Sequence, residues 1–439
     1  MKSSIFSFGE TFHERRASVY MLLLGTFMQT QINIGGYAGI SETVLVALFP
    51  FLCLKNYSIF VEDKCTVILH LLVLWIIGVV CSDLYNDIII SATIRGLIPP
   101  VSLLTSIIVI YPLLRNNPNS LKWYLVGTFL SSIISIFIFQ TGADVGNYEV
   151  LSGQVSAVEA VMRYKLFWVN RITSFISLPI TGWYTVFPHK FSILLMLGMA
   201  VFGLYEGGRS TFALGMVKVM LLAVGGHTAF TMRRMRKNVV PIMIIIGVVA
   251  MISKGIYATA AKSGWMGEAE YGKYEKQAEG KSLMEILMAG RTEFFIASSA
   301  IKDHPFIGHG SMAIDKDGYV VRFVQEYGTD EELRLVLYDR QRNGDRTIPA
   351  HSHIVLYWMW AGLAGLLPWI YILYLIISTI FRRIHIIPIY FGYIVVVGIG
   401  AIWHIFFSPF GLRMNMAVLI SVCLLIRTID HQQKRRFLR

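Results

Sequence analysis

Charged residues are scarce in this chain of 439 residues, because Lys, Arg, Asp and Glu together make up only 15% of it. A soluble globular domain carries about 25% of such residues. Hydrophobic residues reach 55%, and aromatic residues 13%, which excludes a disordered chain because disorder requires a low content of apolar side chains. The composition therefore predicts a protein embedded in a membrane.

Cysteine is also rare, and its four residues are Cys53, Cys65, Cys81 and Cys423. All of them lie within or beside apolar stretches, and none lies in a long hydrophilic segment. A disulfide framework or a thiolate metal site would gather cysteines in such segments. We expect these side chains to behave as small buried hydrophobic groups, and we predict no cofactor.

Apolar stretches of roughly 17 to 25 residues recur along the chain. There are about twelve, which predicts an all-α fold in the form of a polytopic helical bundle. The chain opens without a short apolar core and a small-residue cleavage site, so we expect the first stretch to be retained as a span. Pro99 and Pro100 should kink the fourth span. The predicted spans are 17–34, 38–54, 65–82, 88–113, 122–140, 170–187, 191–206, 210–227, 239–258, 354–380, 386–407 and 411–427.

The distribution of basic residues predicts the orientation of this bundle. With both termini in the cytoplasm, the basic runs at 233–237, 382–383 and 434–436 all fall on the cytoplasmic side, as the positive-inside rule requires. Topology therefore accounts for the net charge of +12, and we expect no nucleic-acid partner.

One segment on the opposite face, residues 259–352, is about 90 residues long, and structureless loops of that length are uncommon unless they are functional. It divides the chain into nine spans over 1–258, a large loop on the non-cytoplasmic side over 259–352, and three spans with a basic cytoplasmic tail over 353–439. Within the loop, 281–301 has the pattern of an amphipathic helix lying on the membrane surface.

Three motifs place costly polar residues beside glycine at the outer boundary of the membrane. In the first, Arg209 opens a predicted span directly after Gly208. The guanidinium offers a fork of donors that matches phosphate oxygens, and glycine lets a ligand approach closely. Alternatively, Arg209 is an anchor whose charged end reaches the interface.

The second motif is Gly-Arg-Thr-Glu at 290–293. Arg291 at the start of a helix would add its charge to the helix dipole and form a seat for a diphosphate. Alternatively, it is a solvated loop arginine with Glu293 as its neighbour. His304 and His309, which follow in the loop, are expected to be structural.

The third motif is His351 and His353 at the exit of the large loop. Histidines at the mouth of a bundle suit proton transfer at neutral pH, although they could equally be interfacial hydrogen-bonding residues. Together with His304 and His309 they could supply four nitrogens to zinc. No His-Glu-x-x-His helix or cysteine cluster supports that alternative, and we predict no metal site.

In their order and spacing these motifs resemble the O-antigen ligase and Wzy-type polysaccharide polymerase superfamily, mainly over residues 190–380. The stretch 310–349 departs from the family pattern because it is long and charged. The resemblance implies a metal-independent, inverting glycosyltransferase of the bacterial inner membrane, whose donor is an undecaprenyl-diphosphate-linked glycan on the periplasmic side. The residues that carry the resemblance are 208–211, 290–293, 303–308, His351-Ser352 and 362–365.

The resemblance also implies roles for individual residues. Arg209 and Arg291 match the arginines proposed to hold the diphosphate, and His351 matches the histidine that heads the family's His-(Asn/Ser/Gln) motif. Either His351 is the general base, or it donates to the diphosphate. In the second case Glu293 is the base, or the acceptor needs no base until late in the reaction. Further expected substrate contacts, of which the last three are alternatively membrane anchors, are Gly208, Gly290, Thr292, Glu293, His353, Arg95, Arg163 and Arg171.

The acceptor defines the remaining alternatives. The run at 290–293 resembles exopolysaccharide and O-antigen polymerases more than ligases. This resemblance favours a polymerase, which hands the glycan to another lipid-linked repeat unit, over a ligase, which hands it to lipid A-core. A chain-length regulator and a flippase would be its protein partners, beside membrane lipids. A transporter of lipid-linked sugar would instead place ionisable residues near mid-membrane and relate its two halves by symmetry, and a membrane scaffold would leave the candidate residues replaceable.

Overall fold

The computed structural model describes most of the chain outside its middle third. The described residues form ten ranges and several short stretches. These are 12–27, 31–33, 37–61, 65–138, 292–328, 330–344, 346–350, 352–383, 390–407 and 413–437, with short stretches at 194, 197–198, 200–201, 212, 214–220, 252, 255–260, 262–264, 271 and 274.

The described residues form an all-helical protein apart from two strands of three residues each. In chain order the elements are α1 (Phe12–Thr26), β1 (Gln31–Asn33), β2 (Tyr37–Gly39), α2 (Ile40–Ala47), α3 (Phe49–Lys55), the 3-10 helix η1 (Tyr57–Val61), α4 (Thr66–Tyr85), α5 (Ile90–Asn116), α6 (Ser120–Ile138), α15 (Thr292–Asp303), α16 (Tyr319–Tyr327), α17 (Asp330–Asn343), α18 (His353–Ser378), the π-helical turn η2 (Thr379–Arg383), α19 (Phe391–Phe407) and α20 (Arg413–Phe437).

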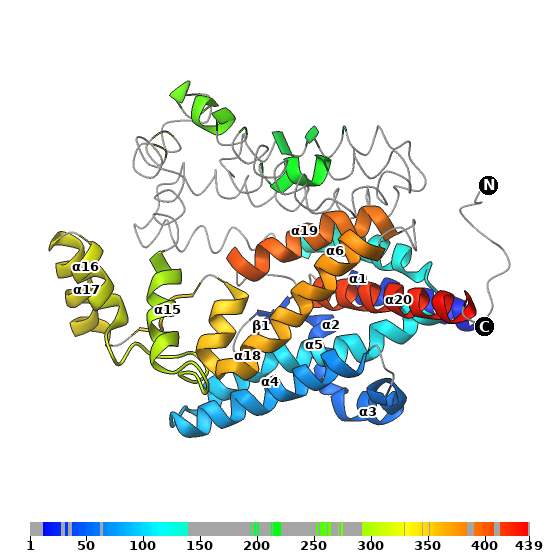
Figure 1. The fold of residues 1–439 in the computed structure, drawn as a ribbon, viewed down its shortest axis with the longest axis horizontal. Coiled ribbons are helices and arrows are strands. Elements are labelled where there is room, and N and C mark those ends of the chain that lie inside the picture. The colour runs from blue at the N-terminus through cyan, green and yellow to red at the C-terminus, as the bar shows by residue number, and fades with distance from the viewer. Residues whose placement is uncertain are drawn as a thin grey trace.

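The long helices pack in pairs that are distant in sequence. α1 runs along α6, α4 along α18, and α5 along α20 (Figure 1). Their facing sides share one apolar cluster, in which Ile68, Leu72 and Ile107 are fully buried, while Leu74 and Ile77 on the other side of α4 are exposed. A helix that is apolar all round is typical of a membrane span.

Four helices are long and apolar enough to cross a membrane, and they lie at 66–85, 90–116, 353–381 and 414–433. They confirm four of the predicted spans. α6 and the shorter apolar helix α19 occupy two more of the predicted stretches. Four further predicted spans, 170–187, 191–206, 210–227 and 239–258, lie wholly or largely outside the described residues.

The first two predicted spans, 17–34 and 38–54, are wrong as continuous helices. Between α1 and α2 the chain forms the antiparallel pair β1 and β2. Polar residues such as Gln31 and Asn33 interrupt the apolar run there, and strand pairing satisfies the backbone groups that the end of a helix leaves free. α2 and α3 are separate because Pro50, in the first turn of α3, has no N–H to continue the helical ladder of α2.

We expected a kink at Pro99 and Pro100, but helical geometry is interrupted elsewhere. α5 continues through both prolines as one helix. The break lies in α18, at Ala361 (φ −124°, ψ 16°) and Gly362 (φ 58°, ψ −145°). Tertiary contacts described below, and not a proline, account for it.

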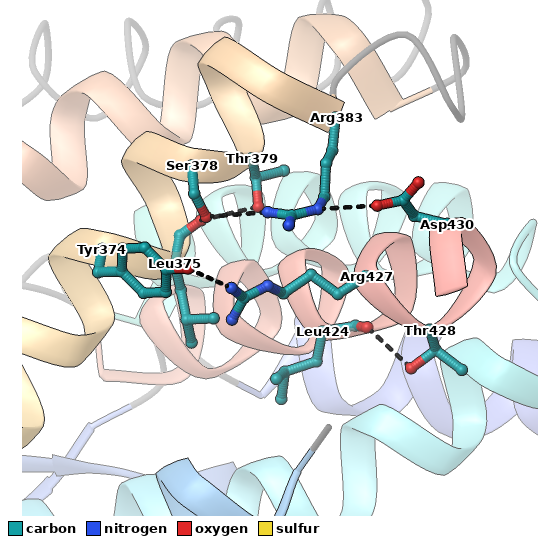
Figure 2. A network of polar contacts seen from close by, with 9 residues as sticks. All are labelled: Tyr374, Leu375, Ser378, Thr379, Arg383, Leu424, Arg427, Thr428 and Asp430. Atoms are coloured by element: carbon teal, nitrogen blue, oxygen red, sulfur yellow. Dashed lines mark hydrogen bonds and ion pairs between the residues drawn. The ribbon is translucent and has the colours of Figure 1, made fainter. Parts of the chain in front are cut away.

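At the end of α18 that leads into η2, two arginines tie this helix to α20 (Figure 2). Nε of Arg383 donates to Oδ2 of Asp430 at 3.1 Å, and its Nη1 donates to Oγ of Ser378 at 3.3 Å. Nη2 of Arg427 donates to the hydroxyl of Tyr374 at 2.9 Å, with the guanidinium carbon 4.9 Å from the ring centre. Both cations therefore have partners.

A second apolar cluster lies at the opposite end of α18. We expected a helix over 281–301; the described part, α15, is helical and begins at Thr292, whereas 281–291 is outside the described residues. Ile296 and Ala300, one turn apart, face this cluster together with Val355 and Met359 of α18. α15 is thus positioned against the first turns of α18 (Figure 1).

Candidate functional site

Residues 306–310, which follow α15, pack into the break of α18. The carbonyl oxygens of Met359 and Trp360 accept hydrogen bonds from the N–H groups of His309 (2.7 Å) and Gly310 (3.1 Å). In return, the N–H of Leu363 donates to the carbonyl of Phe306 at 3.2 Å. Backbone groups that the broken helix would leave unpaired inside an apolar bundle are therefore satisfied by residues 306–310. We call this contact the loop junction.

Two glycines allow the backbones to approach so closely. Gly362 has a positive φ, and a Cβ atom added to it would overlap the carbonyl of Phe306. Gly308 has φ +84°, and its Cβ would lie 2.7 Å from the carbonyl oxygen of Met359. Only glycine avoids both the strain and the overlap. These are the glycines of the predicted motifs at 303–308 and 362–365, so two motifs far apart in sequence meet at one place.

The end of α4 completes the loop junction with three polar side chains. Ser82 donates from Oγ to the carbonyl of Trp360 at 2.7 Å. Asn86, one turn later, donates to the carbonyl of Gly308 at 3.2 Å, and Oδ1 of the buried Asp83 accepts from the N–H of Ser311 at 2.5 Å. Sequence analysis did not identify these residues, although a Ser-Asp pair at the end of an apolar span was a visible signal.

His304 and His309, which were expected to be structural, contact each other and the end of α15. Their rings meet edge to face, 4.8 Å apart. Nε2 of His309 lies 2.7 Å from the carbonyl oxygen of Ala300; because a carbonyl can only accept, this nitrogen carries the proton and is not available to a metal. Within the described part of the chain, no group of three or more His, Cys, Asp or Glu side chains is placed to hold a metal ion.

Ser352 ties the start of α18 to the end of α19. Its Oγ donates to the carbonyl of Ile405 at 2.9 Å and accepts from the N–H of Val355, as a helix cap does. His351 is outside the described residues, but it is joined directly to this fixed residue. The predicted catalytic position is therefore next in sequence to a contact between α18 and α19.

His353 lies in the packed core, with 4% of its surface exposed. Its ring stacks on Trp369 at 4.7 Å between centres and on Tyr357 at 5.9 Å, and Trp75 of α4 packs edge-on against both of these rings. A substrate would reach His353 only if these aromatic rings moved.

The other predicted residues divide into two groups. Thr292 and Glu293 begin α15, the first exposed and the second half-buried, and Arg95 is exposed on α5 beside Gly96, which abuts Ser311 of the loop. These three therefore lie on elements that reach the α15 and loop region. The residues outside the described ranges are Arg209, Arg291, His351, Gly208, Gly290, Arg163 and Arg171.

A cavity of about 490 Å³ lies between α16, α17 and the segment that leads to His351. Apolar side chains such as Val320 and Leu335 line it together with Arg346 and Asp339, which form an ion pair at 2.6 Å, and with Pro349. It combines an apolar wall with charged groups, as ligand sites do.

Asp315 and Tyr319 make hydrogen bonds that connect the elements next to this cavity. The Asp315 carboxylate accepts from the N–H groups of Tyr319 (2.6 Å) and Val320 (3.0 Å) at the start of α16. The Tyr319 hydroxyl donates to Oδ2 of Asp303 at 2.7 Å. Burial, and then this hydrogen bond to a carboxylate, raise the pKa of Tyr319 above its usual range.

Sequence analysis also missed a lysine in a predicted span. Lys218 lies against α19, where a Cβ added to Gly400 would be 3.8 Å from its Nζ. The ammonium also acts electrostatically on His404, one turn further along α19. A lysine within the apolar stretch 210–227 was a signal that could have been read from the sequence.

Comparisons of the chain with protein-family models, with curated proteins and with solved structures give no match. The resemblance to the O-antigen ligase and polymerase superfamily therefore stays a prediction from the motifs.

Proposed function

We propose that this chain is a membrane glycosyltransferase, which moves a glycan from undecaprenyl diphosphate to an acceptor sugar hydroxyl at the periplasmic face of a bacterial inner membrane. The proposal includes about twelve spans, cytoplasmic termini and a periplasmic loop over 259–352. The observation that carries it is the loop junction: the motif at 303–308 and the glycine-rich motif at 362–365 are held together, next to the segments that continue to Arg291 and His351.

The neighbours of the two proposed catalytic residues support a common site. Ile296, five residues after Arg291, and Ala350, just before His351, belong to the same buried cluster. α15 and the start of α18 are thus fixed relative to each other, so residues at their beginnings can act on one substrate. Such rigid support is what a reactive geometry requires.

The chemistry follows from these residue types. The acceptor oxygen forms a bond to the anomeric carbon while the bond from that carbon to the diphosphate oxygen breaks, and the bonding electrons leave with the diphosphate. Arg209 and Arg291 stabilise the charge that develops on the leaving group. The proton of the acceptor hydroxyl passes to His351 or, where His351 donates to the diphosphate, to Glu293.

The run at 290–293 favours a polymerase. The test is a reaction of the purified full chain with undecaprenyl-diphosphate-linked repeat units from its own host, with EDTA present and no other acceptor, and with the products sized on a gel. We expect a ladder of longer lipid-linked glycans. Product that forms only after lipid A-core is added would identify a ligase, and no product with either acceptor would contradict the proposal.

Variants test the residue assignments in the same assay. Arg291→Ala and His351→Ala should abolish the ladder at normal membrane abundance, because each removes a group that acts in the transition state. Arg342→Ala, an exposed arginine on α17, is the matched control and should retain the ladder. Full activity of either site variant would refute the assignment.

A transporter of lipid-linked sugar is a second candidate, and Lys218 within a predicted span is the observation that favours it. A transporter would move a fluorescent polyprenyl diphosphate across proteoliposomes without forming a glycosidic bond. Transport without a ladder would decide for this alternative.

A further inference from the structure

Lys218 is a cation in an apolar part of the bundle. Its neighbours Val217, Val219 and Met220 pack against the main apolar cluster. Among the described residues, Lys218 makes no hydrogen bond or ion pair, and no carboxylate acts on it. Lys218 is half-buried, and an ammonium group in apolar surroundings is costly without a counter-charge, so an anion bound beside it would lower this cost.

His404 supplies the second group of the same site. It lies four residues after Gly400 on α19, and residues at this spacing share one face of a helix. Gly400 is the residue that Lys218 abuts. Nδ1 of His404 is buried and, within the described part of the chain, has no hydrogen-bond partner. Within the described part of the chain, this face of α19 therefore presents a ring nitrogen without a hydrogen-bond partner beside Lys218, which has no counter-charge there.

This pair lies near the end of the bundle that carries the proposed reaction. His404 precedes Ile405, whose carbonyl accepts the hydrogen bond from Ser352, the neighbour of His351. Lys218 is in the same predicted span that Arg209 opens. An anion between Lys218 and His404 would thus be held inside the bundle, below the segment that contains His351.

We propose that Lys218 and His404 form an anion site that binds the phosphate group of a polyprenyl lipid. A phosphate oxygen accepts hydrogen bonds from the ammonium and from the ring nitrogen, and its charge offsets that of Lys218. The lipid as the source of the phosphate rests on the proposed function, whereas the anion site itself rests on the two side chains.

Binding to the purified full chain in detergent tests the proposal, with every protein compared in an Arg209→Ala/Arg291→Ala background that removes the diphosphate contacts of the proposed reaction site. The probes are farnesyl diphosphate, farnesol as the match without phosphate, and inorganic pyrophosphate as the match without lipid. We expect farnesyl diphosphate to bind at least tenfold more tightly than farnesol or pyrophosphate. Lys218→Met should weaken its binding at least tenfold, His404→Phe several-fold, and Lys218→Arg least of all. Lys55→Met, which removes an exposed lysine at the end of α3, should leave the affinity unchanged.

The unfolding temperature separates a binding role from a structural one. Lys218→Met keeps the length of the side chain and removes a charge without a counter-charge, so the ligand-free variant should unfold at the same temperature as the wild type or at a higher one. Its stabilisation by farnesyl diphosphate should disappear. A lysine that merely supports the fold would give a lower unfolding temperature and an unchanged ligand-induced shift.

The outcomes distinguish this inference from the proposed function. Unchanged binding of farnesyl diphosphate to Lys218→Met would overturn the anion site, even if the glycan ladder forms. Pyrophosphate that binds as tightly as farnesyl diphosphate would overturn the assignment to a lipid. Binding that depends on Lys218, together with a wild-type chain that forms no ladder, would support the site and reject the glycosyltransferase.

Discussion

Two regions around α18 and α19 treat charge differently. Where η2 meets α20, Arg383 and Arg427 are paired with a carboxylate and a tyrosine, respectively (Figure 2). Against the middle of α19, beside Gly400, Lys218 has no hydrogen-bond or ion-pair partner in the described part of the chain. Paired cations fix the ends of helices, whereas a cation without a counter-charge is kept at a cost in stability. This difference is the basis on which we propose that Lys218, and not the paired arginines, binds a ligand.

A substitution at the break in α18 should have the largest effect on the stability of the protein. Gly362→Ala places a Cβ where the carbonyl of Phe306 lies and forces a backbone conformation that non-glycine residues avoid. We expect a loss of about 3 kcal/mol or more in the free energy of unfolding, from strain and overlap together. Chemical denaturation measures it. Gly255→Ala, whose added Cβ meets no described atom within 4 Å, should change little, and equal stability of the two variants would contradict the loop junction.

Removal of the carboxylate that α4 contributes should have the next largest effect. Asp83→Ala leaves the buried N–H of Ser311 without an acceptor, which costs about 1–3 kcal/mol. Limited proteolysis of the loop, together with the unfolding temperature, measures this release. Asp83→Asn keeps an acceptor oxygen and should lose less, and Asp317→Ala removes an exposed carboxylate as a control. Identical digestion of Asp83→Ala and the wild type would show that this contact does not hold the loop.

The paired end should respond more weakly. Arg383 and Asp430 are 20% and 18% exposed, and we expect Arg383→Met or Asp430→Asn to cost about 1 kcal/mol. Because the two side chains contact each other, the double variant should lose less than the sum of the single losses. A thermal double-mutant cycle provides the measurement, and strict additivity would show that the pair contributes nothing.

The smallest effect concerns pH in the large loop. Burial and the bond to Asp303 raise the pKa of Tyr319, so the folded state keeps this proton more tightly than the unfolded state does. The resulting stability is complete below the unfolded pKa of about 10 and is lost as the pH rises above it. Unfolding temperatures measured from pH 8 to 11 should fall more steeply for the wild type than for Tyr319→Phe. Parallel curves would show that Tyr319 does not titrate in this way.

Apolar length predicted the main helices but not their interruptions. α4, α5, α18 and α20 were predicted because each is a long apolar run, and a membrane requires little else of a span. The hairpin of β1 and β2 was missed because the mean hydropathy of a long apolar stretch hides the two polar residues Gln31 and Asn33. The break in α18 was missed because contacts with residues distant in sequence cause it, whereas Pro99 and Pro100 lie within one continuous helix.

The candidate site was predictable in its motifs but not in its supports. Gly308 and Gly362 lie in motifs that the sequence identified, and their meeting gives those motifs a structural reason. Ser82 and Asp83 act through a tertiary contact that no spacing encodes. Lys218 could be recognised in the sequence as a lysine in an apolar run. Its proximity to Gly400 and His404 of α19 could not be predicted from the sequence.

The loop junction also constrains the order in which the protein can be assembled. Residues 306–310 are synthesised before α18, yet their hydrogen-bond partners are Met359, Trp360 and Leu363. During synthesis the segment must therefore wait until α18 has been made before it can dock. A nascent chain that ends before α18 would expose an unfinished loop to proteases, whereas the completed chain protects it, so quality control could recognise truncated copies by this segment.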